Sequence, residues 1–349
     1  MVKFYYSLKS SLITHLALII LSKYKEEIMK SCKVVFLTSL SDKVVDEIIS
    51  YSHKDFEIIV LKNSDSEEKC ISEIKDCDFL LCHGKYPTDS MLNSAKRCKL
   101  VQLLAAGFDQ MNLSLINSME IPLANNGGAN SWAVSDHAVL LMLSLYKKII
   151  DSDKSTRSGT WKKPINGENT FEMANKKVGI LGIGNIGKKV AKRVQAFDSI
   201  AQYYDLFPLD NQLNSQLSLK SVSLDELFET SDIITSHMPL NDQTFHMINS
   251  DRFSQMKTSS ILINTSRGEI IDEKALISAL DSREILGAGL DVFETEPIQP
   301  DNPLLKMDNV IVTPHVAGTT WDTWARRSEF AFSNMIRIID GDKILGQIN

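Results

Sequence analysis

Cysteine is scarce in this sequence, and its distribution excludes two kinds of stabilised architecture. The 349 residues contain five cysteines, all in the first third of the chain. Their number is odd and none forms a C-x-x-C pair, so we expect neither a disulfide framework nor a metal site of the zinc type. We interpret them as small apolar residues of a protein in a reducing compartment. They are Cys32, Cys70, Cys77, Cys82 and Cys98.

An excess of basic charge and a membrane-spanning run are also missing. The formal net charge is −6, and a nucleic-acid partner would call for a basic patch or stripe. The apolar run at residues 12–21 is shorter than the about 20 apolar residues that a spanning helix needs. No small-residue cleavage site of a signal peptide follows it. We interpret residues 1–29 as an N-terminal extension of a cytoplasmic protein that has no membrane partner.

The chain is long enough to hold two hydrophobic cores, because single cores stop growing well below this length. From residue 33 onward, short apolar runs alternate with segments of helical periodicity, which indicates βαβ units and a parallel sheet. The strands expected in this first series are 33–38, 56–61, 78–82 and 100–104, and the expected helices are 42–51, 66–76 and 88–97.

A second series of strands and helices follows a long apolar helix expected over residues 131–150 and a polar loop expected over 151–170. Six strands with intervening helices match a complete doubly wound nucleotide-binding sheet. The two series predict an α/β fold of two doubly wound parallel-sheet domains with a ligand-binding cleft between them. The expected strands are 177–181, 200–204, 232–236, 259–264, 286–293 and 310–313, followed by a terminal helix at 319–339.

A glycine-rich turn follows the first strand of the second series. Gly182, Gly184 and Gly187 stand between this strand and a helix, where glycines permit a tight turn and close approach of a pyrophosphate to the backbone. Asp205 ends the next strand, 23 residues after Gly182, where a carboxylate would bind the ribose hydroxyls. Because a carboxylate repels the 2′-phosphate of NADP, and no arginine follows within 206–212, we expect NAD as the cofactor.

Three ionisable residues follow the last three strands of this sheet: Arg267, Glu296 and His315. Taken singly, each would more often be an ordinary surface residue. Ligands of open α/β sheets bind outside the carboxyl ends of the strands, however, so all three are expected at the edge that holds the cofactor.

The same three groups suit the reduction of a 2-keto acid. A guanidinium can hold the substrate carboxylate with two parallel hydrogen bonds. A protonated imidazole can donate a proton to the carbonyl oxygen as hydride arrives. A carboxylate beside the imidazole favours its protonated form and orients the ring. The sequence therefore predicts an oxidoreductase that transfers a hydride between NAD(H) and a small 2-hydroxy or 2-keto acid.

Several stretches resemble the D-isomer-specific 2-hydroxyacid dehydrogenase family, from about residue 33 to the end. They are VGILGIGNIGKKVA, SHMPLNDQTFHMIN, ILINTSRGEIIDEKAL, GAGLDVFETEP and VIVTPHVAGTT. The resemblance implies that Arg267 binds the substrate carboxylate, that His315 is the acid/base and that Glu296 pairs with it. It also implies a flavodoxin-like substrate domain, 30–130 and 315–349, a Rossmann nucleotide domain, 131–314, and a homodimer formed through the 131–150 helix.

Further site residues are implied by the resemblance alone. Asp291 would bind the nicotinamide carboxamide, and Gly107 would be a backbone donor to the substrate carboxylate. His137 stands where the family often has a histidine, in a motif that departs from the family pattern, and we interpret it as a packing residue. The full expected cofactor set is Gly182, Gly184, Asn185, Ile186, Gly187, Asp205, Met238, Pro239, Thr244, Thr265, Ser266, Arg267, Asp291 and His315.

Two alternatives remain open from the sequence. Phosphite oxidation on the same fold keeps the three catalytic residue types, whereas formate dehydrogenases of this superfamily carry glutamine at the position of Glu296. A corepressor-like scaffold would keep the NAD site without significant turnover, but such relatives tend to have long disordered tails that we do not expect here. The identity of the 2-keto acid depends on loops near 83–87 and 105–109, and neither these loops nor the motif around Trp321 and Trp324 indicates it.

Overall fold

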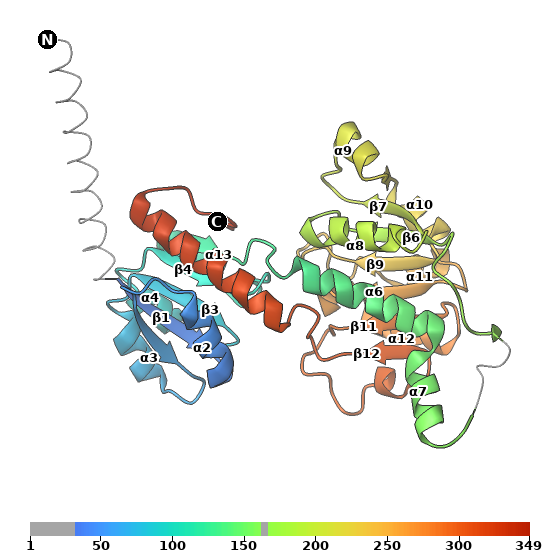
Figure 1. Cartoon of the computed structure of the whole chain (residues 1–349), viewed down its shortest axis with the longest axis horizontal. Helices are drawn as coiled ribbons and strands as arrows, with labels where there is room; N and C mark the ends of the chain where they lie inside the picture. Colours follow the sequence, from blue (N-terminus) through green and yellow to red (C-terminus); the bar gives the residue numbers. More distant parts are fainter. Residues whose placement is uncertain (1–31, 162–166) are drawn as a thin grey trace, which may run out of the picture. The chain divides into compact units, whose positions relative to one another are not determined.

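The computed structural model describes residues 32–161 and 167–349, which form two compact units. Unit 1 contains the described residues up to Asn130 together with Thr320–Asn349, and unit 2 contains the described residues of Ser131–Thr319. Figure 1 shows each unit as a sheet with helices packed on it. The N-terminal extension expected at 1–29 lies outside the described residues.

Unit 1 contains a five-stranded parallel sheet in the order β2-β1-β3-β4-β5. This is the flavodoxin-like order, in which the chain reverses its winding direction between β1 and β3. The apolar runs of the first series thus form the expected parallel sheet, and the short last strand was not predicted. The strands are β1 (Lys33–Thr38), β2 (Glu57–Leu61), β3 (Phe79–His83), β4 (Leu100–Leu103) and β5 (Leu123–Ala124).

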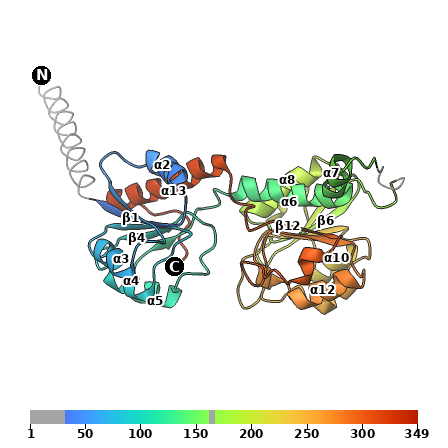
Figure 2. The same cartoon turned by 90° about the horizontal axis from the view of Figure 1, so that it is seen from below.

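Helices cover both faces of this sheet because alternate residues of each strand point to opposite sides. Phe36 of β1 packs in one apolar cluster with Phe332, whereas Leu37 packs in another with Ile74. Figure 2 shows the two helical layers. One layer is α2 (Asp42–Ser50) and α13 (Trp321–Asp340), and the other is α3 (Glu67–Ile74), α4 (Asp89–Ser94) and α5 (Leu113–Ser118). All five cysteine side chains are buried in this unit, as expected for small apolar residues.

Unit 2 contains a seven-stranded parallel sheet in the order β12-β11-β10-β9-β6-β7-β8. Its first six strands along the chain, β6 to β11, have the order of a Rossmann sheet, with the reversal between β6 and β9. The six predicted strands are confirmed, and the short β8 adds one that was not predicted. The strands are β6 (Lys177–Leu181), β7 (Ile200–Tyr204), β8 (Lys220–Ser221), β9 (Ile233–Ser236), β10 (Ile261–Asn264), β11 (Gly287–Leu290) and β12 (Val310–Val312).

The sheet of unit 2 is also covered on both faces. Ile180 packs with Met142 and Val190 of one helical layer, whereas its neighbour Leu181 packs with Leu227 of the other. The first layer contains α6 (Ser131–Lys147) and α8 (Asn185–Gln195), which pack against each other. The second contains α10 (Leu224–Thr230), α11 (Ser250–Gln255) and α12 (Glu273–Asp281), and α9 (Asn211–Gln216) follows β7.

The predicted end of the long apolar helix is wrong. Helix α6 ends at Lys147, and Lys148 adopts a left-handed conformation with φ of 50°. This conformation cannot continue a right-handed helix, so the chain changes direction there. A separate helix, α7 (Ile149–Arg157), occupies part of the expected polar loop and buries none of its residues.

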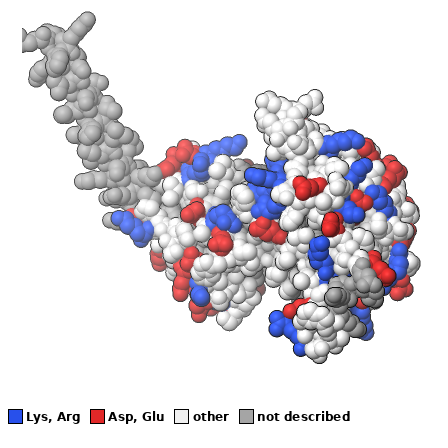
Figure 3. All heavy atoms as spheres, turned by 45° about the vertical axis from the view of Figure 1, so that its right-hand side comes forward, with Lys and Arg blue, Asp and Glu red and all other residues white. Residues whose placement is uncertain are grey.

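The surface carries both signs of charge. Figure 3 shows Lys and Arg interspersed with Asp and Glu on the face that it displays. Among the residues that the structure describes, no helix has the length and apolar character needed to cross a membrane.

Candidate active site

The loops that follow the strands of unit 2 carry almost all of the predicted site residues. Parallel strands have their carboxyl ends at the same edge of a sheet, so these loops are neighbours. The first loops contribute the glycine-rich turn after β6 and Asp205 after β7. The loop after β9 contributes Met238, Pro239 and Thr244, and the loop after β10 contributes Thr265, Ser266 and Arg267. Asp291 and Glu296 follow β11, and His315 follows β12.

The glycine-rich turn leaves its backbone open to a ligand. Gly182 has φ of 90°, a conformation that side chains disfavour. A Cβ at Gly187 would lie 2.1 Å from the Gly182 oxygen, whereas a Cβ at Gly184 would meet nothing within 4 Å. Gly184 precedes α8 and, having no side chain, does not cap the first amides of this helix. The turn and the helix N-terminus therefore fit the pyrophosphate of a dinucleotide.

Asp205 is held beside this turn by two backbone amides. Its Oδ2 accepts a hydrogen bond from the Ile183 amide at 2.7 Å, and its Oδ1 accepts one from the Phe207 amide at 2.8 Å. A carboxylate has about four acceptor sites, so each oxygen keeps acceptor capacity for a ribose hydroxyl. A role of Asp205 toward the ribose stays a prediction.

The next two loops offer buried polar atoms. Thr244 Oγ1 donates a hydrogen bond to the Pro239 carbonyl at 2.7 Å and thereby closes the loop after β9. Thr265 Oγ1 is buried and has no hydrogen-bond partner, although buried hydroxyls normally have one. Nδ1 of His237 is likewise buried without a partner, and burial lowers the pKa of this histidine to about 3. These orphaned atoms fit a site whose polar ligand supplies the missing partners.

The Arg267 loop is shaped by Asn264, whose side chain is fully buried. Asn264 Oδ1 accepts hydrogen bonds from both the amide and the hydroxyl of Ser266. Its Nδ2 donates to the Arg267 carbonyl at 2.8 Å. Arg267 itself has an extended backbone, and its Nη1 donates to the Ser266 carbonyl at 2.6 Å. Asn264 therefore sets where the Arg267 backbone leaves the sheet, which the sequence analysis did not foresee.

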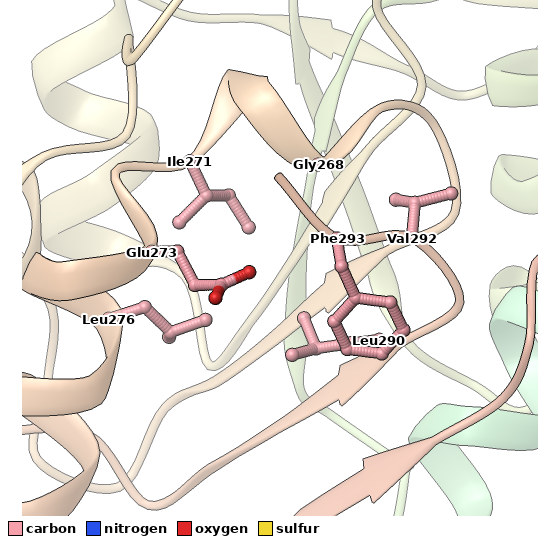
Figure 4. Close-up of a pocket in the computed structure, with 7 residues that line it drawn as sticks. All are labelled: Gly268, Ile271, Glu273, Leu276, Leu290, Val292 and Phe293. Carbon is pink, nitrogen blue, oxygen red and sulfur yellow. The ribbon is translucent and has the colours of Figure 1, made fainter. Parts of the chain in front are cut away.

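Gly268 lets the Arg267 loop approach the segment that leads to Glu296. A Cβ at Gly268 would lie 1.9 Å from the Phe293 carbonyl carbon and 2.4 Å from the Glu294 nitrogen. Only glycine permits this approach. A small cavity lies beside the contact, with Glu273 and Leu276 facing Leu290 and Phe293 (Figure 4). Its empty volume of about 190 Å³ is below the 300–1,000 Å³ typical of ligand pockets, so we assign it to packing.

Glu296 and His315 form a pair. Nδ1 of His315 lies 2.6 Å from Oε2 of Glu296, and Oε1 of Glu296 accepts a hydrogen bond from the Phe293 amide at 3.1 Å. Burial raises the pKa of Glu296, but the hydrogen bond and charge of His315, the Phe293 amide and the charge of Arg267 outweigh it. The pKa of Glu296 is therefore lowered, and the carboxylate is ionised at neutral pH. Both side chains remain partly accessible to solvent.

Asp291 holds the loop that carries His315. Asp291 is 1% exposed; its Oδ1 accepts hydrogen bonds from the Thr313 hydroxyl at 2.5 Å and the Val316 amide at 2.9 Å. Its Oδ2 accepts from the Ala317 amide at 2.8 Å. These contacts stabilise His315 in a left-handed conformation with φ of 53°. For a residue other than glycine, this backbone conformation costs about 1–3 kcal/mol of folding free energy. A role of Asp291 toward the nicotinamide stays a prediction.

His137 makes a polar contact that its interpretation as a packing residue did not include. Its Nε2 lies 3.0 Å from Thr313 Oγ1. Because the Thr313 hydroxyl donates to Asp291, the His137 nitrogen is the donor in this contact. The residue stands on α6, far from the others in sequence, and a histidine at a helix position has no local signal that would reveal such a partner.

Gly107 lies in unit 1, in the loop after β4. The contact of its backbone with the substrate carboxylate stays a prediction.

Among the described residues of both units, no cluster of three or more His, Cys, Asp or Glu side chains could hold a metal ion.

Known proteins are similar to this chain in fold and in sequence. Residues 139–317 match the NAD binding domain of the D-isomer specific 2-hydroxyacid dehydrogenases. A glyoxylate reductase of Thermofilum pendens is 35% identical over 292 residues, which cover 82% of this chain and 86% of the relative. A glyoxylate reductase of Korarchaeum cryptofilum is 33% identical over 313 residues, which cover 88% and 93%.

A solved structure is also similar to this chain over most of its length. The D-lactate dehydrogenase of Lactobacillus jensenii with NAD+ has a TM-score of 0.75 and 25% identity to this chain, covering 90% of this chain and 99% of the other. The family match extends over the fingerprint, Arg267, Glu296 and His315. The chain therefore belongs to the D-isomer specific 2-hydroxyacid dehydrogenases, NAD-dependent oxidoreductases that interconvert 2-hydroxy acids and 2-keto acids.

Proposed function

We propose that the protein reduces a small 2-keto acid to the D-2-hydroxy acid with NADH, using Arg267, Glu296 and His315. The observation that carries this proposal is the 2.6 Å contact between His315 Nδ1 and Glu296 Oε2. This pair follows strands of the sheet whose other loops form the dinucleotide cradle, and Arg267 follows an adjacent strand.

His315 is the proposed general acid. With Nδ1 bonded to Glu296, Nε2 is left to face the substrate. In the protonated imidazole both nitrogens are donors, so Nε2–H donates a proton to the carbonyl oxygen while Glu296 stabilises the positive charge. NADH, held at the glycine-rich turn and Asp205, would supply the hydride. In the oxidation direction the neutral imidazole accepts the hydroxyl proton.

Arg267 is the proposed carboxylate-binding residue. A guanidinium presents parallel N–H donors that match a carboxylate, and this contact would fix the adjacent carbonyl carbon for hydride transfer. Gly107 is proposed as a further donor to the same carboxylate from unit 1. We propose that the remaining expected cofactor contacts, including Met238, Thr265 and Asp291, line the dinucleotide site.

The proposed substrates are glyoxylate, hydroxypyruvate and pyruvate. Support comes from the names of the relatives, which are glyoxylate reductases and a D-lactate dehydrogenase. NAD is preferred over NADP because Asp205 stands at the ribose position with its carboxylate oriented by two amides.

We also propose a cytoplasmic homodimer. Helix α6 exposes Trp132 and Leu140, which are 52% and 56% exposed, and a second copy would cover such apolar side chains. The buried cysteines suit a reducing compartment.

The test is an assay of NADH oxidation with glyoxylate, hydroxypyruvate and pyruvate tested singly, and of NAD+ reduction with phosphite in parallel. We expect saturable turnover of at least one keto acid, and Arg267→Gln should raise its KM by about 100-fold, since charge-assisted hydrogen bonds are strong. Absence of turnover with every keto acid, or unchanged kinetics in the variant, would overturn the proposal.

A further inference from the structure

A second contact between a histidine and a glutamate lies in unit 2. His246 belongs to the loop after β9, and Glu294 belongs to the segment that leads from β11 to Glu296. Nε2 of His246 lies 2.7 Å from Oε1 of Glu294, and both side chains are partly accessible to solvent. A carboxylate only accepts hydrogen bonds, so Nε2 carries the proton and is the donor. The contact therefore joins two loops of one sheet edge.

Glu294 also binds the start of α12, the helix that follows the Arg267 loop. Its Oε1 accepts a hydrogen bond from the Glu273 amide at 3.0 Å, and its own amide donates to Glu273 Oε2 at 3.2 Å. The first amides of a helix have no partner within the helix, and a carboxylate is a favourable one. The loops that carry Thr244, Arg267 and Glu296 thus meet at one carboxylate.

The loop after β9 has backbone hydrogen bonds that do not depend on the His246 side chain. The amides of Thr244 and Phe245 donate to the Asn241 carbonyl at 3.0 and 2.9 Å, and the His246 amide donates to the Glu269 carbonyl at 2.8 Å. The Phe245 ring stacks on the His246 ring, with 4.0 Å between centroids and 14° between planes. This loop is therefore a stable support to which Glu294 is attached.

The position of Glu296 depends on the backbone just before it. Oε1 of Glu296 accepts a hydrogen bond from the Phe293 amide at 3.1 Å, while its Oε2 meets Nδ1 of His315 at 2.6 Å. Phe293 and Glu294 are consecutive residues, so a shift of Glu294 would move the amide that orients Glu296. The contact between His246 and Glu294 restricts such a shift.

We propose that His246 and Glu294 are positioning residues for the Glu296–His315 pair, because their contact holds the segment that orients Glu296 against the loop after β9. This proposal rests on the proposed function, since it concerns the same reaction. Neither side chain needs to touch substrate or cofactor in this role. Loss of the contact should therefore lower kcat and leave NADH binding unchanged, because the loop after β9 keeps its backbone hydrogen bonds.

The first experiment compares His246→Leu with His246→Gln. The backbone at His246 is left-handed, with φ of 47°, and both replacements bear a similar cost there, so the comparison isolates the hydrogen bond. Leucine has no donor, whereas the amide nitrogen of glutamine lies as many bonds from Cβ as Nε2 of histidine does. We expect kcat for keto-acid reduction to fall about tenfold with leucine, because small misplacements of catalytic groups slow reactions strongly. Glutamine should restore most of it, and equal losses in both variants would refute the positioning role.

Lys220→Met is the matched control. Lys220 forms an ion pair with Glu226 at 2.6 Å in the same unit, and its removal should leave kcat unchanged. The melting temperatures of all these variants should lie within about 4 °C of wild type, because exposed ion pairs contribute little stability. The affinity for NADH, measured by fluorescence titration, should stay within about threefold. A loss of NADH affinity as large as the loss of kcat in His246→Leu would contradict the proposal.

Removal of Glu296 provides a second criterion. In Glu296→Ala the group to be positioned is absent, so adding His246→Leu should lower kcat by less than about a further twofold. Independent effects would instead multiply, and a further loss as large as in the single variant would contradict the proposal. If His246→Leu does not fold, His246→Asn replaces it in each comparison, because asparagine tolerates a left-handed backbone and its amide nitrogen is one bond closer to Cβ.

The proposal and the proposed function fail in different ways. If no keto acid supports NADH oxidation, the proposed function is wrong, and NMR titration of the Glu296 carboxyl carbon in the whole protein still tests the positioning role. Burial raises the pKa of Glu296, but the contacts with His315 and Phe293 and the charge of Arg267 bring it below its ordinary value of 4.5. His246→Leu should move this pKa toward 4.5, and His246→Gln should not. An unchanged Glu296 titration in the folded leucine variant would exclude the positioning role.

Discussion

Nδ1 of His315 lies 2.6 Å from Oε2 of Glu296, and these two residues come from loops that follow different strands. Asp291 holds the histidine loop through three hydrogen bonds, and the Phe293 amide orients the glutamate. The pair is therefore supported from both sides before any substrate binds, which is the preorganisation that general acid catalysis requires.

Replacement of His315 by asparagine should remove the proton donor and leave the fold intact. We expect kcat for keto-acid reduction to fall by about 10²–10⁴, the usual contribution of general acid catalysis. NADH binding, followed by fluorescence titration, should stay close to wild type. Normal turnover in this variant would remove His315 from the mechanism.

Glu296→Gln tests the charge of the pair. The neutral amide no longer stabilises the protonated imidazole, so the pH above which keto-acid reduction declines should move to lower values. The measurement is a pH profile of kcat/KM for variant and wild type. If kcat/KM of the variant declines at the same alkaline pH as that of the wild type, Glu296 does not act through His315.

The same pair should contribute to the pH dependence of stability. The pKa of Glu296 is lowered from an ordinary value of 4.5 in the folded protein, so its contribution is present above that value and is lost as the pH falls through the lowered pKa. Melting temperatures of wild type and Glu296→Gln should therefore differ most at neutral pH and converge in acid. A difference that grows on acidification would contradict the lowered pKa.

Thr313 links His137 to Asp291, and its hydroxyl should matter for catalysis. Thr313→Val removes this link, and we expect kcat to fall by about tenfold with little change in the KM for NADH, because the His315 loop loses one support. Thr313→Ser retains the hydroxyl and should restore kcat. If the serine variant is as impaired as the valine variant, the methyl group rather than the hydrogen bond is responsible.

Asp205→Asn should change the cofactor preference. The amide is nearly isosteric but uncharged, so it repels a 2′-phosphate less than the carboxylate does. We expect the ratio of kcat/KM with NADPH to that with NADH to rise. Arg193→Met, a change of charge elsewhere in the same unit, is the control and should leave the ratio unchanged.

Gly268→Ala should destabilise unit 2. The added Cβ would lie 1.9 Å from the Phe293 carbonyl carbon, and relief requires a backbone shift that costs about 1–3 kcal/mol or more. Gly184→Ala, whose Cβ meets nothing within 4 Å, should lower the melting temperature less. Thermal unfolding of the two variants provides the comparison, and equal melting temperatures would contradict the required close approach.

Much of this molecule follows from local sequence patterns. The strand before Gly182, the glycine spacing and Asp205 are predictable because a dinucleotide turn is built from consecutive residues. The strand-end positions of Arg267, Glu296 and His315 are predictable because parallel strands bring their carboxyl ends to one edge. The glutamate and histidine are 19 residues apart, and the alternation of strands and helices alone places their loops side by side.

Other features depend on tertiary structure. Helix α6 ends at Lys147 because Lys148 adopts a left-handed conformation, although the apolar sequence continues through Ile149 and Ile150. Nη1 of Arg327 contacts Nε2 of His83, 244 residues away, and no periodicity relates the two residues. Sequence patterns report which face of an element is apolar, whereas hydrogen bonds between distant side chains depend on how packed elements meet. The chemistry of the site was therefore determined by sequence, and the partners that orient each side chain were decided by packing.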